Sequence, residues 1–216
     1  MKKIFIAVDT TDLKKVKRII SQSQTKKIKI GYKFGLEFMN SKGGRNFVSK
    51  LRNKIIFVDQ KLNDTVNTML SAVKALKDLR INYLTVHISS GLTALKAVKK
   101  VSRCKIVGVT TLTSLNNKDL KTIGYNRSIK NLVAHQARLA KKAGLDALVC
   151  SPHEVNIVRK IFKKEIITPG VQIGKKNYDQ KRSMEAKKVN SDWLVIGRSI
   201  TSGNIKNNIQ KLIKSL

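Results

Sequence analysis

The sequence lacks any long apolar run. No stretch approaches the roughly 18 apolar residues that a membrane-spanning helix needs, so we expect no membrane partner. Met1-Lys2-Lys3 leads directly into a short strand-like segment, without the longer apolar stretch and small-residue cleavage site of a signal peptide. We therefore expect a cytoplasmic protein.

Cysteine is scarce as well. Cys104 and Cys150 are the only two, and both lie in apolar runs without the spacing of metal ligands. This excludes a disulfide framework and a cysteine-based zinc site. The two residues are expected to be buried free thiols in a reducing compartment.

Acidic residues are few, with 13 Asp and Glu against 45 Lys and Arg, which gives a formal net charge of +32. Such a balance first suggests a nucleic acid or an anionic membrane surface. The lysines, however, are spread over nearly every segment and are not interleaved with aromatic residues. We interpret the charge as a compositional bias whose positive field draws in phosphorylated metabolites. We expect no nucleic-acid partner, and a basic RNA-binding module stays as the alternative from another class.

Apolar, strand-like runs alternate with helical patterns along the whole chain. With 216 residues, 41% of them hydrophobic, the chain can bury a sizeable core, and we expect one domain over residues 1–216. The predicted strands cover residues 4–8, 27–34, 54–62, 82–87, 105–112, 147–151, 165–169 and 193–197. The predicted helices cover 12–21, 45–52, 66–79, 91–101, 128–143, 153–163, 180–189 and the C-terminal segment.

Local signals refine these boundaries. Thr10 or Thr11 is available to cap the first helix, and Gly144 is suited to end the helix over 128–143. The stretch 115–127 is predicted to be the longest irregular loop.

Most of the predicted strands are continuous apolar runs, as expected of parallel strands covered on both faces. Eight strand–helix units favour a single (β/α)8 TIM barrel of the α/β class, with an open doubly wound sheet as the alternative. No G-x-G-x-x-G pattern follows the first strand, which disfavours a dinucleotide-binding fold.

A cluster of charges ends the third predicted strand. Asp59 and Lys61 point the same way if the strand alternates regularly, and Asp64 follows where the strand gives way to a helix. Charge at the end of a buried element is costly unless it is paired, so the cluster indicates a site rather than a solvated turn.

In a barrel the carboxyl ends of the strands meet at one mouth, where chemistry takes place. The residues that the predicted strands bring there are Asp9, Lys33, Asp59, Lys61, Asp64, His87, Thr113, Ser151, Pro169, Gly170, Gly197 and Arg198. Asp9 could instead be only a helix cap. His87 is interpreted as a hydrogen-bonded strand-end residue rather than an acid–base catalyst.

All of these residues except His87 belong to segments through which the chain resembles, in order and over essentially its full length, the orotidine 5′-phosphate decarboxylase family. The segments are Asp9 at the end of the first strand, Lys33-Phe34-Gly35-Leu36-Glu37-Phe38, Asp59-x-Lys61-x-x-Asp64 with Thr68, Leu112-Thr113-Ser114, Gly144-Leu145-Asp146 with Val149-Cys150-Ser151, Thr168-Pro169-Gly170, Asp179-Gln180-Lys181-Arg182 and Gly197-Arg198-Ser199-Ile200-Thr201. The chain departs from the family pattern at Asn63, at Thr65-Val66 and at Gln172, which stands in the place of an Arg.

The resemblance implies a reaction, the removal of carbon dioxide from orotidine 5′-phosphate to give uridine 5′-phosphate, without cofactor or metal. It implies that Lys61 stabilises the carbanion on the pyrimidine ring and donates a proton to it. Asp59 and Asp64 would hold Lys61 charged, and Lys33 would pair with the carboxylates and reach the ribose hydroxyls.

The resemblance also assigns substrate contacts. Besides Asp9, the residues expected to bind substrate are Thr113 at the pyrimidine edge, with Gln180, Gly197 and Arg198 at the phosphate. A loop over 174–178 would close as a lid. Asp64 and Thr68 would complete the site of the neighbouring subunit, which implies a homodimer.

A different enzyme on the same scaffold is the nearest alternative. Hexulose-phosphate synthase shares an Asp-x-Lys-x-x-Asp motif but uses Mg²⁺. It lacks the Leu112-Thr113-Ser114 and Asp179-Gln180-Lys181-Arg182 segments found here.

Overall fold

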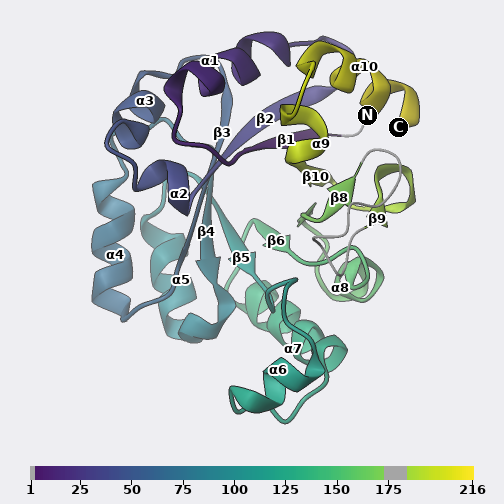
Figure 1. Ribbon diagram of the computed structural model, residues 1–216. Helices are drawn as coiled ribbons and strands as arrows, with labels where there is room; N and C mark the ends of the chain where they lie inside the picture. The colour runs from purple at the N-terminus through teal and green to yellow at the C-terminus, as the bar shows by residue number, and fades with distance from the viewer. Residues whose placement is uncertain (1–2, 173–183) are drawn as a thin grey trace.

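The apolar runs form a closed barrel of parallel strands in the computed structural model, which describes residues 3–172 and 184–216 (Figure 1). Around the barrel the order is β1-β10-β7-β6-β5-β4-β3-β2, and β1 pairs with both β2 and β10. The strands are β1 Lys3–Val8, β2 Lys29–Gly35, β3 Ile55–Leu62, β4 Tyr83–His87, β5 Lys105–Val109, β6 Ala147–Val149, β7 Glu165–Thr168 and β10 Trp193–Ile196. The predicted (β/α)8 barrel is confirmed, and the open sheet was the wrong alternative.

Helices surround the barrel and bury apolar side chains in the core around it, except α6, which lies beside α7 and away from the strands (Figure 1). They are α1 Leu13–Gln22, α2 Leu36–Met39, α3 Gly44–Lys50, α4 Val66–Ala75, α5 Gly91–Val101, α6 Asn117–Thr122, α7 Ile129–Lys142, α8 Val155–Ile161, α9 Arg198–Thr201 and α10 Ile205–Ser215. Gly144 follows α7 with φ +72°, as predicted for a residue that ends a helix. No helix within the described ranges has both the length and the apolar character needed to cross a membrane.

Three local predictions were wrong. The stretch 115–127 is not wholly irregular, because Asn116 and Asp119 form a capping box that begins α6. Asp12, rather than Thr10 or Thr11, caps α1, and its Oδ1 accepts the backbone N–H of Lys14 at 2.8 Å.

The third concerns the helix expected over 180–189. Its described part is a short strand, β9 Met184–Glu185, and a 3₁₀ turn, Ala186–Lys188, while the rest lies outside the described residues. β9 pairs with β8 Val171–Gln172, so a partner distant in sequence overrides the local helical pattern.

Aromatic side chains fill the barrel interior toward the amino-terminal ends of the strands. Phe5 stacks on Trp193 with ring centroids 4.0 Å apart and lies 4.9 Å from the Phe57 ring. Gly31 on β2 makes room for this stack, since a Cβ there would come within 2.6 Å of the Phe5 ring. This part of the interior is therefore a packed core, and a cavity lies toward the carboxyl ends of the strands.

A single carboxylate closes the amino-terminal end of the barrel. Glu165 accepts hydrogen bonds from Lys105 Nζ at 2.9 Å, Tyr83 Oη at 3.0 Å, Lys3 Nζ at 3.2 Å and Trp193 Nε1 at 3.3 Å. Burial by itself raises the pKa of Glu165, but the bonds from Lys105, Tyr83 and Lys3 outweigh it and lower the pKa. Burial and the Glu165 charge raise the pKa of Tyr83 to about 12. At this end of a barrel, such a network serves stability.

We predict that Glu165→Gln lowers the free energy of unfolding at pH 7 by about 2 kcal/mol, because charge-assisted bonds to two lysines are lost. The folded-state pKa of Glu165 lies below the ordinary value of 4.5, so its stabilisation is present above that value and is lost as the pH falls through the folded pKa. The difference between wild type and variant should therefore shrink below about pH 4.5. Urea titrations at several pH values measure it.

The matched control is Glu185→Gln. It removes a more exposed ion pair, in which Lys188 Nζ lies 3.5 Å from Glu185 Oε2, and it should change the free energy of unfolding by less than about 0.5 kcal/mol. Equal losses for the two variants would contradict the role given to Glu165.

Candidate active site

A cavity of about 330 Å³ opens at the carboxyl ends of the barrel strands. Seven of the ten predicted site residues line it: Asp9, Lys33, Asp59, Lys61, Thr113, Gly197 and Arg198. They come from β1, β2, β3, the loop after β5 and the end of β10, segments that only barrel closure brings together.

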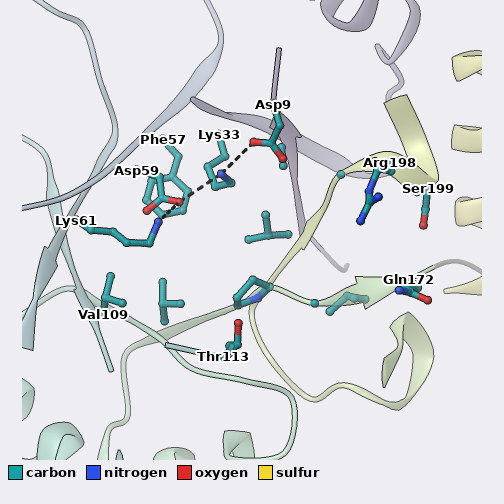
Figure 2. A pocket seen from close by; sticks show the side chains of 17 residues that line it. Asp9, Lys33, Phe57, Asp59, Lys61, Val109, Thr113, Gln172, Arg198 and Ser199 are labelled. Atoms are coloured by element: carbon teal, nitrogen blue, oxygen red, sulfur yellow. Dashed lines mark hydrogen bonds and ion pairs between the residues drawn. The ribbon is translucent and has the colours of Figure 1, made fainter. Parts of the chain in front are cut away.

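One wall of the cavity carries a row of alternating charges (Figure 2). We call Asp9, Lys33, Asp59 and Lys61 the charged row. Lys61 Nζ lies 3.0 Å from Asp59 Oδ2, and Lys33 Nζ lies 3.3 Å from the same oxygen. Lys33 Nζ is also 3.6 Å from Asp9 Oδ1. Each neighbour in the row is thus a charge of opposite sign.

Burial and charge compete at the centre of this row. The Asp59 side chain is only 11% exposed, and burial by itself would raise its pKa. The ammonium groups of Lys33 and Lys61 outweigh burial and lower the pKa of Asp59 below its ordinary value. Asp59 is therefore a carboxylate at neutral pH, and it holds the Lys61 ammonium at the cavity wall.

The backbone that presents Lys61 is irregular. Lys61 has φ +50°, and the pairing of β3 with β4 shifts register between Val58 and Leu62. Regular alternation, on which the sequence argument relied, therefore does not set the direction of Lys61. A bulge in β3 does so instead, in a backbone conformation that non-glycine residues adopt rarely and at a cost of about 1–3 kcal/mol.

Sequence reasoning missed Thr85, which lies beneath this bulge. Its side chain is fully buried on β4, and its Oγ1 contacts both Lys61 and Asp59. The only signal in the sequence is a hydroxyl between Leu84 and Val86, and that does not say what the hydroxyl binds.

The opposite wall of the cavity carries different chemistry. Figure 2 shows Arg198, Ser199 and Gln172 across the cavity from Lys61. Gln172, noted in the sequence only as a departure from the family pattern, is thus a cavity residue. The cavity thus has the Arg198 guanidinium on one wall and the charged row on the other.

Thr113 lies on a loop that α7 holds in place. Gln136 is 8% exposed, and its Oε1 accepts the backbone N–H of Thr111 at 2.8 Å and the Thr111 hydroxyl at 3.1 Å. This anchor fixes the start of the loop that carries Thr113 to the cavity.

Two predicted site residues do not reach their own cavity. Asp64 and Thr68 are exposed at the start of α4. Asp64 Oδ1 accepts the N–H of Thr65 at 2.7 Å, and the hydroxyls of Thr65 and Thr68 are 3.0 Å apart. Gln180 and the lid expected over 174–178 lie outside the described residues.

Further titratable groups near the barrel are His87 and the two cysteines. His87 ends β4, and burial followed by the nearby Lys61 charge lowers its pKa. Cys150 is buried as predicted, whereas Cys104 is only partly buried, and both thiols are free. Within the described ranges, no group of three or more His, Cys, Asp or Glu residues is placed to hold a metal ion.

The fold and the site together define a class: (β/α)8 barrels with a lysine–carboxylate site at the mouth, suited to stabilising negative charge. A model of the Orotidine 5′-phosphate decarboxylase / HUMPS family matches residues 2–211. The chain therefore belongs to this family.

Individual relatives agree. A protein from Wolbachia sp. subsp. Brugia malayi named orotidine 5′-phosphate decarboxylase is 42% identical over 228 aligned residues, which cover 100% of both chains. A protein of the same name from Prochlorococcus marinus is 38% identical over 217 aligned residues, which cover 92% of this chain and 88% of that protein. The crystal structure of orotidine 5′-phosphate decarboxylase from Lactobacillus acidophilus superposes with a TM-score of 0.84 at 26% identity, covering 100% of this chain and 99% of that one.

Proposed function

We propose that this chain catalyses the decarboxylation of orotidine 5′-phosphate to uridine 5′-phosphate in pyrimidine synthesis. The observation that carries the proposal is the charged row, which places a lysine between a buried carboxylate and an open cavity. The relatives that bear this activity in their names, at 34–42% identity, support the same conclusion.

The chemistry required is the stabilisation of a carbanion. When carbon dioxide leaves, the electron pair of the broken bond stays on the pyrimidine carbon, and a proton must replace the lost group. The Lys61 ammonium beside that carbon stabilises the charge and then supplies the proton. An arginine would donate its proton far too reluctantly.

Asp59 has two functions in this mechanism. It keeps Lys61 charged and oriented, because its Oδ2 lies 3.0 Å from Lys61 Nζ. Its negative charge also faces the substrate carboxylate, and the repulsion between them is relieved as carbon dioxide departs. Asp64 of the partner subunit would add a second carboxylate beside Lys61.

Lys33 and Asp9 extend the charged row toward the sugar. Lys33 Nζ lies within 3.6 Å of both Asp59 and Asp9, so it holds the two carboxylates side by side while remaining at the cavity wall. Hydroxyl groups of the ribose suit this mixture of donors and acceptors. Thr113, on the loop after β5, would read the pyrimidine edge.

The phosphate would lie against the opposite wall. Arg198 begins α9, and its guanidinium can bind a phosphate through two parallel hydrogen bonds. The backbone N–H groups of Gly197 and Arg198 and the side chain of Gln180 would add donors. Because α9 is only 4 residues long, the Arg198 charge contributes more than the helix dipole.

The alternatives receive less support. A Mg²⁺-dependent hexulose-phosphate synthase would share the barrel, but relatives at 36–42% identity bear the decarboxylase name. An RNA-binding module would concentrate its basic residues, whereas the lysines of this chain occur in nearly every segment. A cytoplasmic location and the absence of a nucleic-acid partner stay predictions from the sequence.

A homodimer is part of the proposal. Asp64 and Thr68 are exposed at the rim of the barrel and do not line the cavity of their own chain. A second copy of the chain that brings them over its partner's cavity would explain why residues of the Asp-x-Lys-x-x-Asp signature lie outside it. Each active site would then need two chains.

The first test is turnover in the presence of a chelator. We expect wild-type protein to consume orotidine 5′-phosphate, followed by its absorbance, with no loss of rate in EDTA. Lys61→Ala should lower kcat by about 10⁴-fold or more, because both a proton donor and a charge-stabilising group are lost. The exposed Lys211→Ala is the charge-matched control and should retain full activity. Loss of turnover in EDTA would favour the Mg²⁺-dependent enzyme, and substantial turnover by folded Lys61→Ala would refute its role.

The second test concerns the phosphate. Arg198→Ala should raise the Kd for uridine 5′-phosphate by about 10- to 100-fold, since each charge-assisted hydrogen bond contributes roughly 1.5–3 kcal/mol. The affinity for uridine, which carries no phosphate, should change little. Isothermal titration of both ligands measures the difference, with Arg103→Ala, exposed just before β5 at the other end of the barrel, as the control. Equal losses for the two ligands would make Arg198 structural.

The third test concerns the shared site. When the Asp64→Ala and Lys61→Ala homodimers exchange subunits at random, about half the dimers are mixed, and each mixed dimer holds one undamaged site. About a quarter of all sites should therefore regain activity. Mixing Asp59→Ala with Lys61→Ala is the control, because both residues line the same chain's cavity and no intact site can form. If demonstrated exchange restores nothing in the first mixture, Asp64 acts in its own chain.

A further inference from the structure

We propose that Thr85 is a positioning residue for the decarboxylation, one hydroxyl that sets both the backbone of Lys61 and the rotation of the Asp59 carboxylate. The inference rests on the proposed function and extends it to a residue outside the cavity. Thr85 is fully buried in the middle of β4 and does not line the cavity, so it acts only through its neighbours.

Its two hydrogen bonds have only one possible direction. The backbone N–H of Lys61 can only donate, and it donates to Thr85 Oγ1 over 2.7 Å. The hydroxyl proton is then free to be donated to Asp59 Oδ1 at 3.1 Å. A hydroxyl has one proton and two lone pairs, so it can make both bonds at once.

The first bond replaces a missing part of the β-sheet ladder. β3 pairs with β4 at Val58 and again at Leu62, and the register shifts between them. Lys61 lies in this gap with φ +50°, a conformation that a lysine does not hold without support from its surroundings. The Thr85 hydroxyl supplies the acceptor that a regular ladder would have provided in this place.

The second bond fixes which oxygen of Asp59 faces the lysines. Thr85 binds Oδ1, while Lys33 and Lys61 both lie against Oδ2. Free rotation of the carboxylate would exchange the two oxygens and change the direction in which Lys61 is held. Because Thr85 is β-branched and lies on a strand, its own side chain has little rotational freedom. The hydroxyl therefore serves as a fixed reference for the lysine–carboxylate pair.

The two bonds lead to a specific kinetic expectation. Thr85 touches neither the cavity nor the opposite wall with Arg198, so its loss should leave ligand affinity nearly unchanged. The position of Lys61 Nζ should become less exact, and misplacement of a catalytic group by about 1 Å can cost on the order of 10²-fold in rate.

The test compares variants that differ in this one hydroxyl. Thr85→Val keeps the branched shape and removes the hydroxyl, and we expect kcat to fall by about 10- to 100-fold while KM and the Kd for uridine 5′-phosphate change by less than about threefold. Thr85→Ser restores the hydroxyl and should recover most of kcat. Thr168→Val is the matched control, because Thr168 is equally buried at the end of β7 and its hydroxyl has no hydrogen-bond partner among the described residues.

If Thr85→Val does not fold, Thr85→Ala and Thr85→Ser provide the same comparison, since they differ by a single oxygen. Wild-type kcat in both hydroxyl-free variants, or equal losses in Thr85→Ser and Thr85→Ala, would overturn the inference. A wild-type protein that does not turn over orotidine 5′-phosphate would overturn the proposed function, and this inference with it. Wild-type turnover together with an unaffected Thr85→Val would overturn this inference alone.

Discussion

Asp59 is a carboxylate held almost wholly out of water, and the chemistry of the site depends on the charges that make this possible. A buried carboxylate without a partner would take up a proton or destabilise the fold. Lys33 and Lys61 prevent both by placing their ammonium groups within 3.3 Å of one Asp59 oxygen. The same contacts direct Lys61 into the cavity, so the stability of the buried charge and the orientation of the lysine are one requirement.

A carboxylate withdrawn from water lies at each end of the barrel, partly buried at Glu165 and buried at Asp59, and the two are bound differently. At the amino-terminal end, Glu165 accepts four hydrogen bonds beside the aromatic layer of the barrel interior. At the carboxyl end, Asp59 is bound on one side and open to the cavity on the other. A carboxylate whose oxygens are all hydrogen-bonded within the protein suits a structural role, whereas a carboxylate in a binding site must keep part of its charge available to a ligand.

Much of the fold could be read from the sequence because its signals are local. Continuous apolar runs indicate parallel strands whatever their partners are, and their number favoured a barrel. Asp9, Lys33, Asp59 and Arg198 could be placed at the mouth because each follows or ends such a run. The errors at Asp12 and in the stretch 115–127 were also local, since the capping signals that decide them are present in the sequence.

The sequence by itself thus determined the barrel and most of the residues at its mouth. Tertiary structure alone decided the geometry of Lys61, because its left-handed backbone and the bulge in β3 arise from how β3 meets β4. It also decided the partners of Thr85, a single hydroxyl in an apolar strand. A hydrogen bond between residues 24 positions apart depends on strand register, and no spacing within either segment encodes that register.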